Sequence, residues 1–193
     1  MPALAFDSRF EADQMVAQIA LCSVLTLEGD KTTLRDLWGT EPTMTCFLRH
    51  FGCLFCHQMV HDAVEAVPEV IRRGAQVVLV GNGSVEQAAH FFSGKGLPQN
   101  GCKVVTDPGR ESYRTAGFGR GYGATFNRKS KRAYGRARQQ GHRIVGLFGD
   151  LTQLGGVLVT APPLRLLYLH RSEFAGDHPE MTQVLSAVDS AIR

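Results

Sequence analysis

The sequence predicts an α/β fold in which a central mixed sheet is flanked by helices. Short apolar runs of strand length alternate with amphipathic segments of helical spacing along much of the chain. The last third instead brings two apolar runs close together, which is typical of an antiparallel hairpin. With 193 residues, of which 44% are hydrophobic and 20% charged, the chain can build one domain with its own core over residues 1–193.

The N-terminal part is expected to begin with a helix and to continue with strands. Apolar residues recur at helical spacing over 8–20, behind a candidate N-cap at Asp7, so residues 1–23 are predicted to form a helical extension. Runs of strand length stand at 24–27, 44–48 and 75–80, with a helical turn at 34–38. A long amphipathic helix is predicted after residue 56, and Pro68 should kink or restart it.

Capping patterns place two further helices. Ser84 and Gln87 have the spacing of a capping box that opens a helix. After another short strand, Asp107 followed by Pro108 has the pattern of an N-cap and a first helical residue. Gly117 is expected to end that helix.

The C-terminal third completes the pattern. Residues 156–160 and 164–169 have the composition of two hairpin strands, and the apolar spacing after Pro179 predicts a closing helix. Parallel strand-helix units followed by an antiparallel hairpin and a helix form the element order of a thioredoxin-like fold. Residues 118–148, rich in Lys and Arg, are expected to be a basic insertion within the domain.

Five cysteines, at positions 22, 46, 53, 56 and 102, are an odd number in a chain too long to need a disulfide framework. A reducing compartment suits free thiols, so we expect the protein to be cytoplasmic. No secretion signal is visible at the start, and no run of about 18 apolar residues predicts a membrane span. For Cys22, Cys46 and Cys102, packing in the core is the expected role.

Cys53 and Cys56 stand apart because the segment from Thr43 to Cys56 passes from a buried strand through a short turn into a helix. Unpaired N–H groups and the positive dipole end at the start of a helix favour a thiolate, so Cys53 is the expected nucleophile. Cys56 returns to the same helix face, where its sulfur can attack an oxidised Cys53. Arg49 and His50 are candidates to supply positive charge or a proton.

Other interpretations of the same residues remain open. Residues 53–57 match the C-x-x-C-H pattern of haem c attachment, although no export route or distal ligand is evident. Both cysteines can also be buried spacers of the core. A structural metal site is a further alternative, although ligands so close within one helix are unlike a two-armed zinc site. Its four ligands would be Cys53, Cys56, His57 and His61.

A strongly basic segment lies between residues 110 and 143, where ten Lys or Arg residues face a single acid, Glu111. It supports an alternative function, a non-catalytic binding module for an anionic partner. Six of the cations gather around Tyr134, namely Arg128, Lys129, Lys131, Arg132, Arg136 and Arg138. One aromatic residue is a thin stacking platform, so no nucleic acid is expected as a partner. A patch that draws an anionic substrate or an acidic protein donor toward the thiols is favoured instead.

The run Phe47-Leu48-Arg49-His50-Phe51-Gly52-Cys53, completed by Cys56, resembles the peroxiredoxin-like branch of the alkyl hydroperoxide reductase and thiol-specific antioxidant (AhpC/TSA) superfamily. Residues 107–113 with Gly117-Phe118 are similar to a strand-to-helix segment of that branch. Residues 149–156 are similar to the stretch before its last hairpin, including in prostamide/prostaglandin F synthase-like members. The resemblance covers about residues 24–190.

This resemblance implies an antioxidant enzyme that reduces peroxide or disulfide substrates through a Cys53–Cys56 dithiol/disulfide cycle. It implies a thioredoxin- or glutathione-type electron donor, and neither a cofactor nor a metal. Two departures accompany it. Cys46 and His50 occupy the places of the proline and threonine that shape the peroxide pocket in typical peroxiredoxins. Gly155-Gly156 stands where a proline precedes the last hairpin, and glycine there is expected to let a substrate approach the backbone closely.

Overall fold

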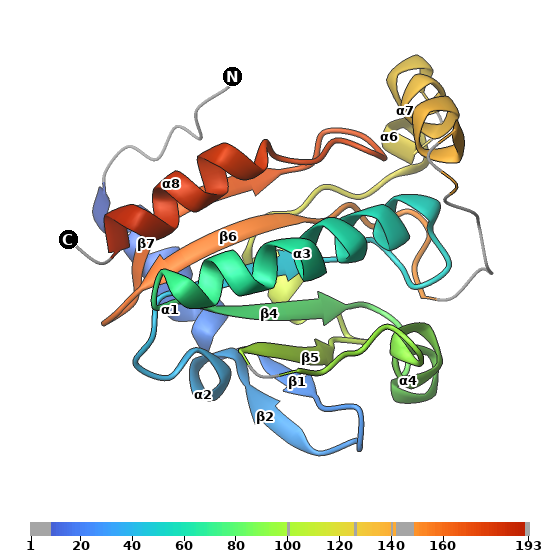
Figure 1. Ribbon diagram of the computed structural model, residues 1–193. Helices are drawn as coiled ribbons and strands as arrows, with labels where there is room; N and C mark the ends of the chain where they lie inside the picture. The colour runs from blue at the N-terminus through green and yellow to red at the C-terminus, as the bar shows by residue number, and fades with distance from the viewer. Residues whose placement is uncertain (1–8, 100, 126, 140, 142–148, 192–193) are drawn as a thin grey trace.

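The computed structural model describes residues 9–99, 101–125, 127–139, 141 and 149–191, and it confirms a mixed sheet between helices (Figure 1). The sheet has seven strands in the order β2-β1-β5-β4-β3-β6-β7. Their bounds are β1 (Ser23–Leu25), β2 (Lys31–Thr33), β3 (Thr43–Phe47), β4 (Gln76–Gly81), β5 (Cys102–Thr106), β6 (Gly156–Ala161) and β7 (Arg165–Arg171). The central strands β3, β4 and β5 are parallel, and the outer strands pair antiparallel.

Helices cover both faces of this sheet, and in Figure 1 α3 and α8 lie in front of it. The helices are α1 (Arg9–Ala20), α2 (Leu34–Trp38), α3 (Leu54–Arg72), α4 (Val85–Phe92), α5 (Glu111–Thr115), α6 (Tyr122–Thr125), α7 (Arg128–Gln139) and α8 (Met181–Ala191). Successive residues of a strand face opposite sides. In β4, Val77 and Leu79 therefore join the apolar layer with α3, α4 and α8, whereas Val78 and Val80 join the layer with α1, α2 and α5.

The connection between β3 and α3 lies at the carboxyl end of the parallel strands. Leu48 N donates to Val80 O at 2.8 Å. The hydroxyl of the buried Tyr113 donates to the carbonyls of Leu48 and Val80, at 2.7 and 2.9 Å. These bonds fix the backbone immediately before Arg49. The start of α3 lies at the same end of the molecule as α4, α6 and α7 (Figure 1).

The prediction for the segment after β5 was wrong in its helix boundary. Asp107 is not the N-cap, because α5 begins only at Glu111 and its N-cap is Arg110, in the left-handed conformation with φ 57°. The Asp107 carboxylate instead accepts from the backbone N and the hydroxyl of Ser112, at 2.8 and 2.6 Å. Asp107 thus anchors the helix from outside its first turn.

Other local predictions are confirmed or refined. The capping box of Ser84 and Gln87 opens α4. Helix α3 continues through Pro68 as one element, so the proline does not restart it. None of the described helices combines the length and apolar character needed to cross a membrane.

Two predicted segments fall partly outside the described residues. The structure does not describe residues 1–8, which include Asp7, or residues 142–148 of the basic segment. The described part of the N-terminal extension includes α1, which packs Val16 and Ile19 into the layer with α2 and α5, and ends at Ser23, the first residue of β1. The described part of the basic segment includes α6 and α7.

Candidate active site

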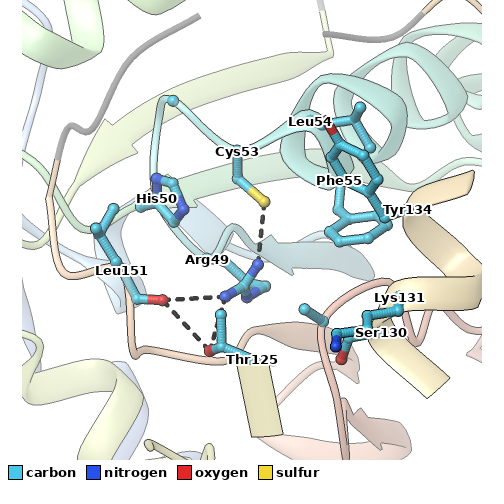
Figure 2. Close-up of a pocket in the computed structure, with 12 residues that line it drawn as sticks. Arg49, His50, Cys53, Leu54, Phe55, Thr125, Ser130, Lys131, Tyr134 and Leu151 are labelled. Atoms are coloured by element: carbon cyan, nitrogen blue, oxygen red, sulfur yellow. Dashed lines mark hydrogen bonds between the residues drawn. The ribbon is translucent and has the colours of Figure 1, made fainter. Parts of the chain in front are cut away.

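Cys53 is the N-cap residue of α3 and borders a cavity of about 290 Å³ (Figure 2). Its backbone is extended, and the residue is 6% exposed. Apolar side chains line much of the cavity, among them Leu54, Phe55 and Leu151. The thiol is therefore withdrawn from bulk water and still faces a space that a small molecule can enter.

Arg49 and His50, both predicted as supporting residues, lie against this thiol. Arg49 Nη1 donates to Cys53 Sγ at 3.0 Å. Burial alone raises the pKa of Cys53, but hydrogen bonds from Cys56 and His50 and the positive charge of Arg49 outweigh it. The pKa of Cys53 consequently lies well below its usual range, which favours the thiolate.

The physical cause of this lowered pKa differs from the one predicted. The Cys53 side chain makes no capping hydrogen bond to the first turn of α3, so the unpaired N–H groups of the helix do not hold its sulfur. It is Cys56 Sγ that accepts from backbone N–H groups, those of Arg49 at 3.2 Å and His50 at 3.4 Å. Neighbouring side chains, rather than helix amides, favour the charged form of Cys53.

The pKa of Cys56 is shifted in the opposite direction. Burial, the hydrogen bond that it shares with Cys53 and the negative charge of Cys53 together hold the pKa of Cys56 well above its usual range. The two sulfurs are hydrogen-bonded neighbours. One of them is favoured as a thiolate and the other as a thiol.

Long-range contacts that the sequence did not indicate hold Arg49 in place. Its Nη2 donates to Thr125 Oγ1 at 3.1 Å and to the carbonyl of Leu151 at 3.0 Å, as Figure 2 shows. Its own carbonyl accepts from the side-chain amide of Asn82. Thr125 lies on α6 and Leu151 precedes β6, so three segments distant in sequence meet at one guanidinium.

The loop that presents the Leu151 carbonyl is itself anchored by charge. Asp150 forms ion pairs with Arg110 and Arg120. Its backbone N donates to Asn82 Oδ1 at 3.0 Å, and its carboxylate accepts from Thr152 N at 2.8 Å. Asn82 therefore bridges the backbone of Arg49 to this loop.

Two buried nitrogen atoms at the cavity have no hydrogen-bond partner among the described residues. They are Arg49 Nε and His50 Nδ1, and both side chains line the cavity. Buried polar atoms in a folded protein are usually paired. The site thus offers polar atoms that a bound substrate can satisfy.

The structure does not assemble the proposed zinc site. Within the described part of the chain, the group of potential ligands close enough to share an ion is His61, Asp62 and Glu65. That group is exposed and contains neither cysteine. The other three cysteines, Cys22, Cys46 and Cys102, are buried free thiols, in agreement with a packing role.

The expectation that Gly155 and Gly156 admit a substrate was wrong. A Cβ on Gly155 would lie 1.9 Å from the carbonyl oxygen of Phe47, and one on Gly156 would lie 2.1 Å from that of His170. Neighbouring backbone already fills this space. Both residues are glycine because the strands on either side of β6 approach closely.

The basic segment borders the site rather than forming a separate one. Helix α7 has no acidic residue, and it buries Ser130, Ala133 and Ala137 while turning its cations outward. Lys131 and Tyr134 on this helix line the cavity beside Cys53. This position agrees with the favoured role of an anion-attracting patch near the thiols.

Comparison with known proteins decides the family. The family model described as AhpC/TSA antioxidant enzyme matches residues 63–173, which is more than half of the chain. The chain belongs to the AhpC/TSA antioxidant enzyme family. It is a peroxiredoxin-like, thiol-dependent oxidoreductase with antioxidant, peroxidase-like function, as the resemblance implied.

Relatives extend this similarity over most of the chain. Peroxiredoxin-like 2C of Mus musculus is 29% identical over 185 residues, covering 90% of this chain and 80% of the relative. Prostamide/prostaglandin F synthase of Xenopus tropicalis is 30% identical over 166 residues, covering 79% and 75%. The crystal structure of peroxidoxin BcpB from Mycobacterium tuberculosis matches with a TM-score of 0.63 at 16% identity, covering 89% and 93%, which shows a shared fold.

The family match leaves the working residues to be argued from geometry. Its range begins within α3, after both Cys53 and Cys56. The assignment of these two thiols therefore depends on their contacts, their protonation and the cavity beside them.

Proposed function

We propose that Cys53 and Cys56 are the redox pair through which this AhpC/TSA family member reduces peroxides. The observation that carries the proposal is the asymmetry of two hydrogen-bonded thiols. Cys53 has a lowered pKa and borders the cavity, whereas the pKa of Cys56 is raised. A nucleophile needs the first property, and a resolving thiol needs to stay protonated until the nucleophile has reacted.

In the first step, the Cys53 thiolate attacks the terminal oxygen of a hydroperoxide ROOH. The S–O bond forms as the O–O bond breaks, so sulfur is oxidised to a sulfenic acid and RO⁻ leaves. RO⁻ takes a proton from His50 or from water and departs as the alcohol. The unpartnered Arg49 Nε and His50 Nδ1 are available to hydrogen-bond the peroxide oxygens.

In the second step, Cys56 resolves the sulfenic acid. Its sulfur attacks the Cys53 sulfur, the S–S bond forms, and the hydroxyl group leaves as water with the Cys56 proton. The negative charge of Cys53 is one cause of the raised pKa of Cys56. Oxidation to the neutral sulfenic acid removes that cause, so Cys56 becomes easier to deprotonate when its thiolate is needed.

We infer that an external thiol donor, one dithiol of thioredoxin type or two molecules of glutathione type, then returns two electrons and two protons to the disulfide. A disulfide substrate enters the same cycle by thiol exchange at Cys53. All five cysteines are buried free thiols, which supports residence in a reducing compartment, the cytoplasm by our proposal.

Steady-state peroxide consumption, coupled to a thioredoxin system and separately to glutathione, tests the proposal. We expect Cys53→Ser to abolish turnover and Cys56→Ser to stop it after one oxidation of Cys53. Cys102→Ser is the matched control, because this buried cysteine lies in β5 outside the site, and it should retain turnover. Turnover that survives Cys53→Ser contradicts the assignment.

A further inference from the structure

The cavity beside Cys53 has walls of two chemical kinds. Leu54, Phe55, Tyr134 and Leu151 give it an apolar lining, and its volume of about 290 Å³ lies near the lower end of small-molecule sites. Hydrogen peroxide needs no such lining, because it has no apolar part. An organic body attached to the peroxide group fits the lining better, since it buries apolar surface there.

Lys131 stands at the opposite side of this cavity from Arg49 (Figure 2). Its side chain has no ion pair or hydrogen bond among the residues that the structure describes. The neighbouring Lys129 differs, because it pairs with Glu173 at 3.8 Å and lies over the ring of Phe174. Lys131 is thus an exposed, uncompensated cation on the rim of an apolar cavity.

The two cations of the cavity have separate tasks. Arg49 is engaged by the sulfur of Cys53, by Thr125 and by the Leu151 carbonyl. For a carboxylate that enters the cavity, the unpaired positive charge is therefore that of Lys131. Helix α7 has no acidic residue that would compete for this charge.

We propose that the cavity selects organic hydroperoxides in which an apolar body carries a carboxylate, and that Lys131 is the specificity-determining residue that pairs with that carboxylate. The inference rests on the proposed function of Cys53. The peroxide group reacts at Cys53 as described above, while the carboxylate stays unchanged at the α7 side of the cavity.

The test compares a medium-chain fatty-acid hydroperoxide, its methyl ester and hydrogen peroxide, each below the concentration at which the lipids form micelles. An ion pair at a partly exposed site changes affinity by about two- to fivefold. We expect kcat/KM for the acid to exceed that for the ester by about this factor. Lys131→Gln should remove the preference by lowering only the value for the acid, and Lys131→Glu should reverse it.

Arg132→Gln is the matched control, because it removes one cation from the same helix at a position that does not line the cavity. It should keep the preference for the acid. If Arg132→Gln and Lys131→Gln lose the preference for the acid equally, the overall positive charge of α7 attracts the acid. That result overturns the assignment to Lys131.

A binding measurement separates this inference from the proposed function. The parent fatty acid, which has no peroxide group, should slow alkylation of Cys53 more than its methyl ester does, and Lys131→Gln should remove the difference. If acid and ester hydroperoxides react equally while turnover still requires Cys53, the inference fails and the proposed function stands. If turnover does not require Cys53, the proposed function itself fails.

Discussion

Replacing Arg49 with methionine removes the cation beside the proposed nucleophile and keeps an unbranched side chain. The lost contact is a charged hydrogen bond of 3.0 Å to Cys53 Sγ, in a site withdrawn from water. Such bonds contribute about 1.5–3 kcal/mol, and each 1.4 kcal/mol corresponds to about tenfold in an equilibrium. The acid dissociation constant of the Cys53 thiol is therefore expected to fall by about ten- to a hundredfold.

The loss of reactivity should be smaller than this loss of acidity. A more basic thiolate is a better nucleophile, with a Brønsted coefficient of about 0.4–0.5, so roughly half of the loss on a logarithmic scale is recovered. At a pH below the midpoints of both proteins, where the thiol form predominates, we predict alkylation of Cys53 to slow by about three- to tenfold in Arg49→Met. Because Arg49 lowers the pKa of Cys53, the midpoint of the rate against pH should also move to higher pH.

Alkylation by iodoacetamide over a range of pH, followed by peptide mass spectrometry of residue 53, measures both quantities. Arg49→Lys is the control, because it keeps the charge but loses the planar group that contacts Cys53, Thr125 and the Leu151 carbonyl together. Its shift should lie between those of the wild type and Arg49→Met. Unchanged rates and an unchanged midpoint in Arg49→Met would refute the electrostatic account.

Three further predictions concern the scaffold around the site, and urea unfolding checks each. Tyr113→Phe should lower the free energy of unfolding by about 1–3 kcal/mol, because the buried carbonyl of Leu48 loses its side-chain donor. An unchanged free energy of unfolding contradicts this. Gly155→Ala should cost about 3 kcal/mol, since the new methyl group meets backbone. Gly135→Ala, in open space on α7, should instead be neutral or stabilising, and equal effects of the two substitutions would contradict the packing argument. Asp150→Asn should lower the free energy of unfolding by about 2 kcal/mol and also lower peroxide turnover, because the ion pairs of Asp150 anchor the loop that contacts Arg49. Wild-type stability and turnover in this variant would contradict that role.

Local patterns in the sequence were sufficient to predict most of the elements in their order and the position of the two thiols, but not β2, α6 or α7. Strand and helix periodicity depends on residues near one another, and the capping box of Ser84 and Gln87 spans only four positions. The strand-turn-helix context likewise placed Cys53 at the start of α3. Arg49 and His50 were found because they lie close before Cys53 in the sequence.

Contacts between distant segments could not be predicted in this way. Thr125 and Leu151 reach Arg49 across 76 and 102 positions of the chain. Nothing in the local pattern of a glycine-rich segment indicates that one of its hydroxyl groups supports a guanidinium. Gly155 was misinterpreted for the same reason, because only the folded sheet shows that Phe47 occupies the space above it.

Addition of one equivalent of an organic hydroperoxide to the fully reduced protein, followed by peptide mass spectrometry under acid quench, tests the pairing most directly. The account predicts one new disulfide, between Cys53 and Cys56, with Cys22, Cys46 and Cys102 recovered as thiols. A sulfenic acid or disulfide that forms first at any of those three cysteines contradicts it.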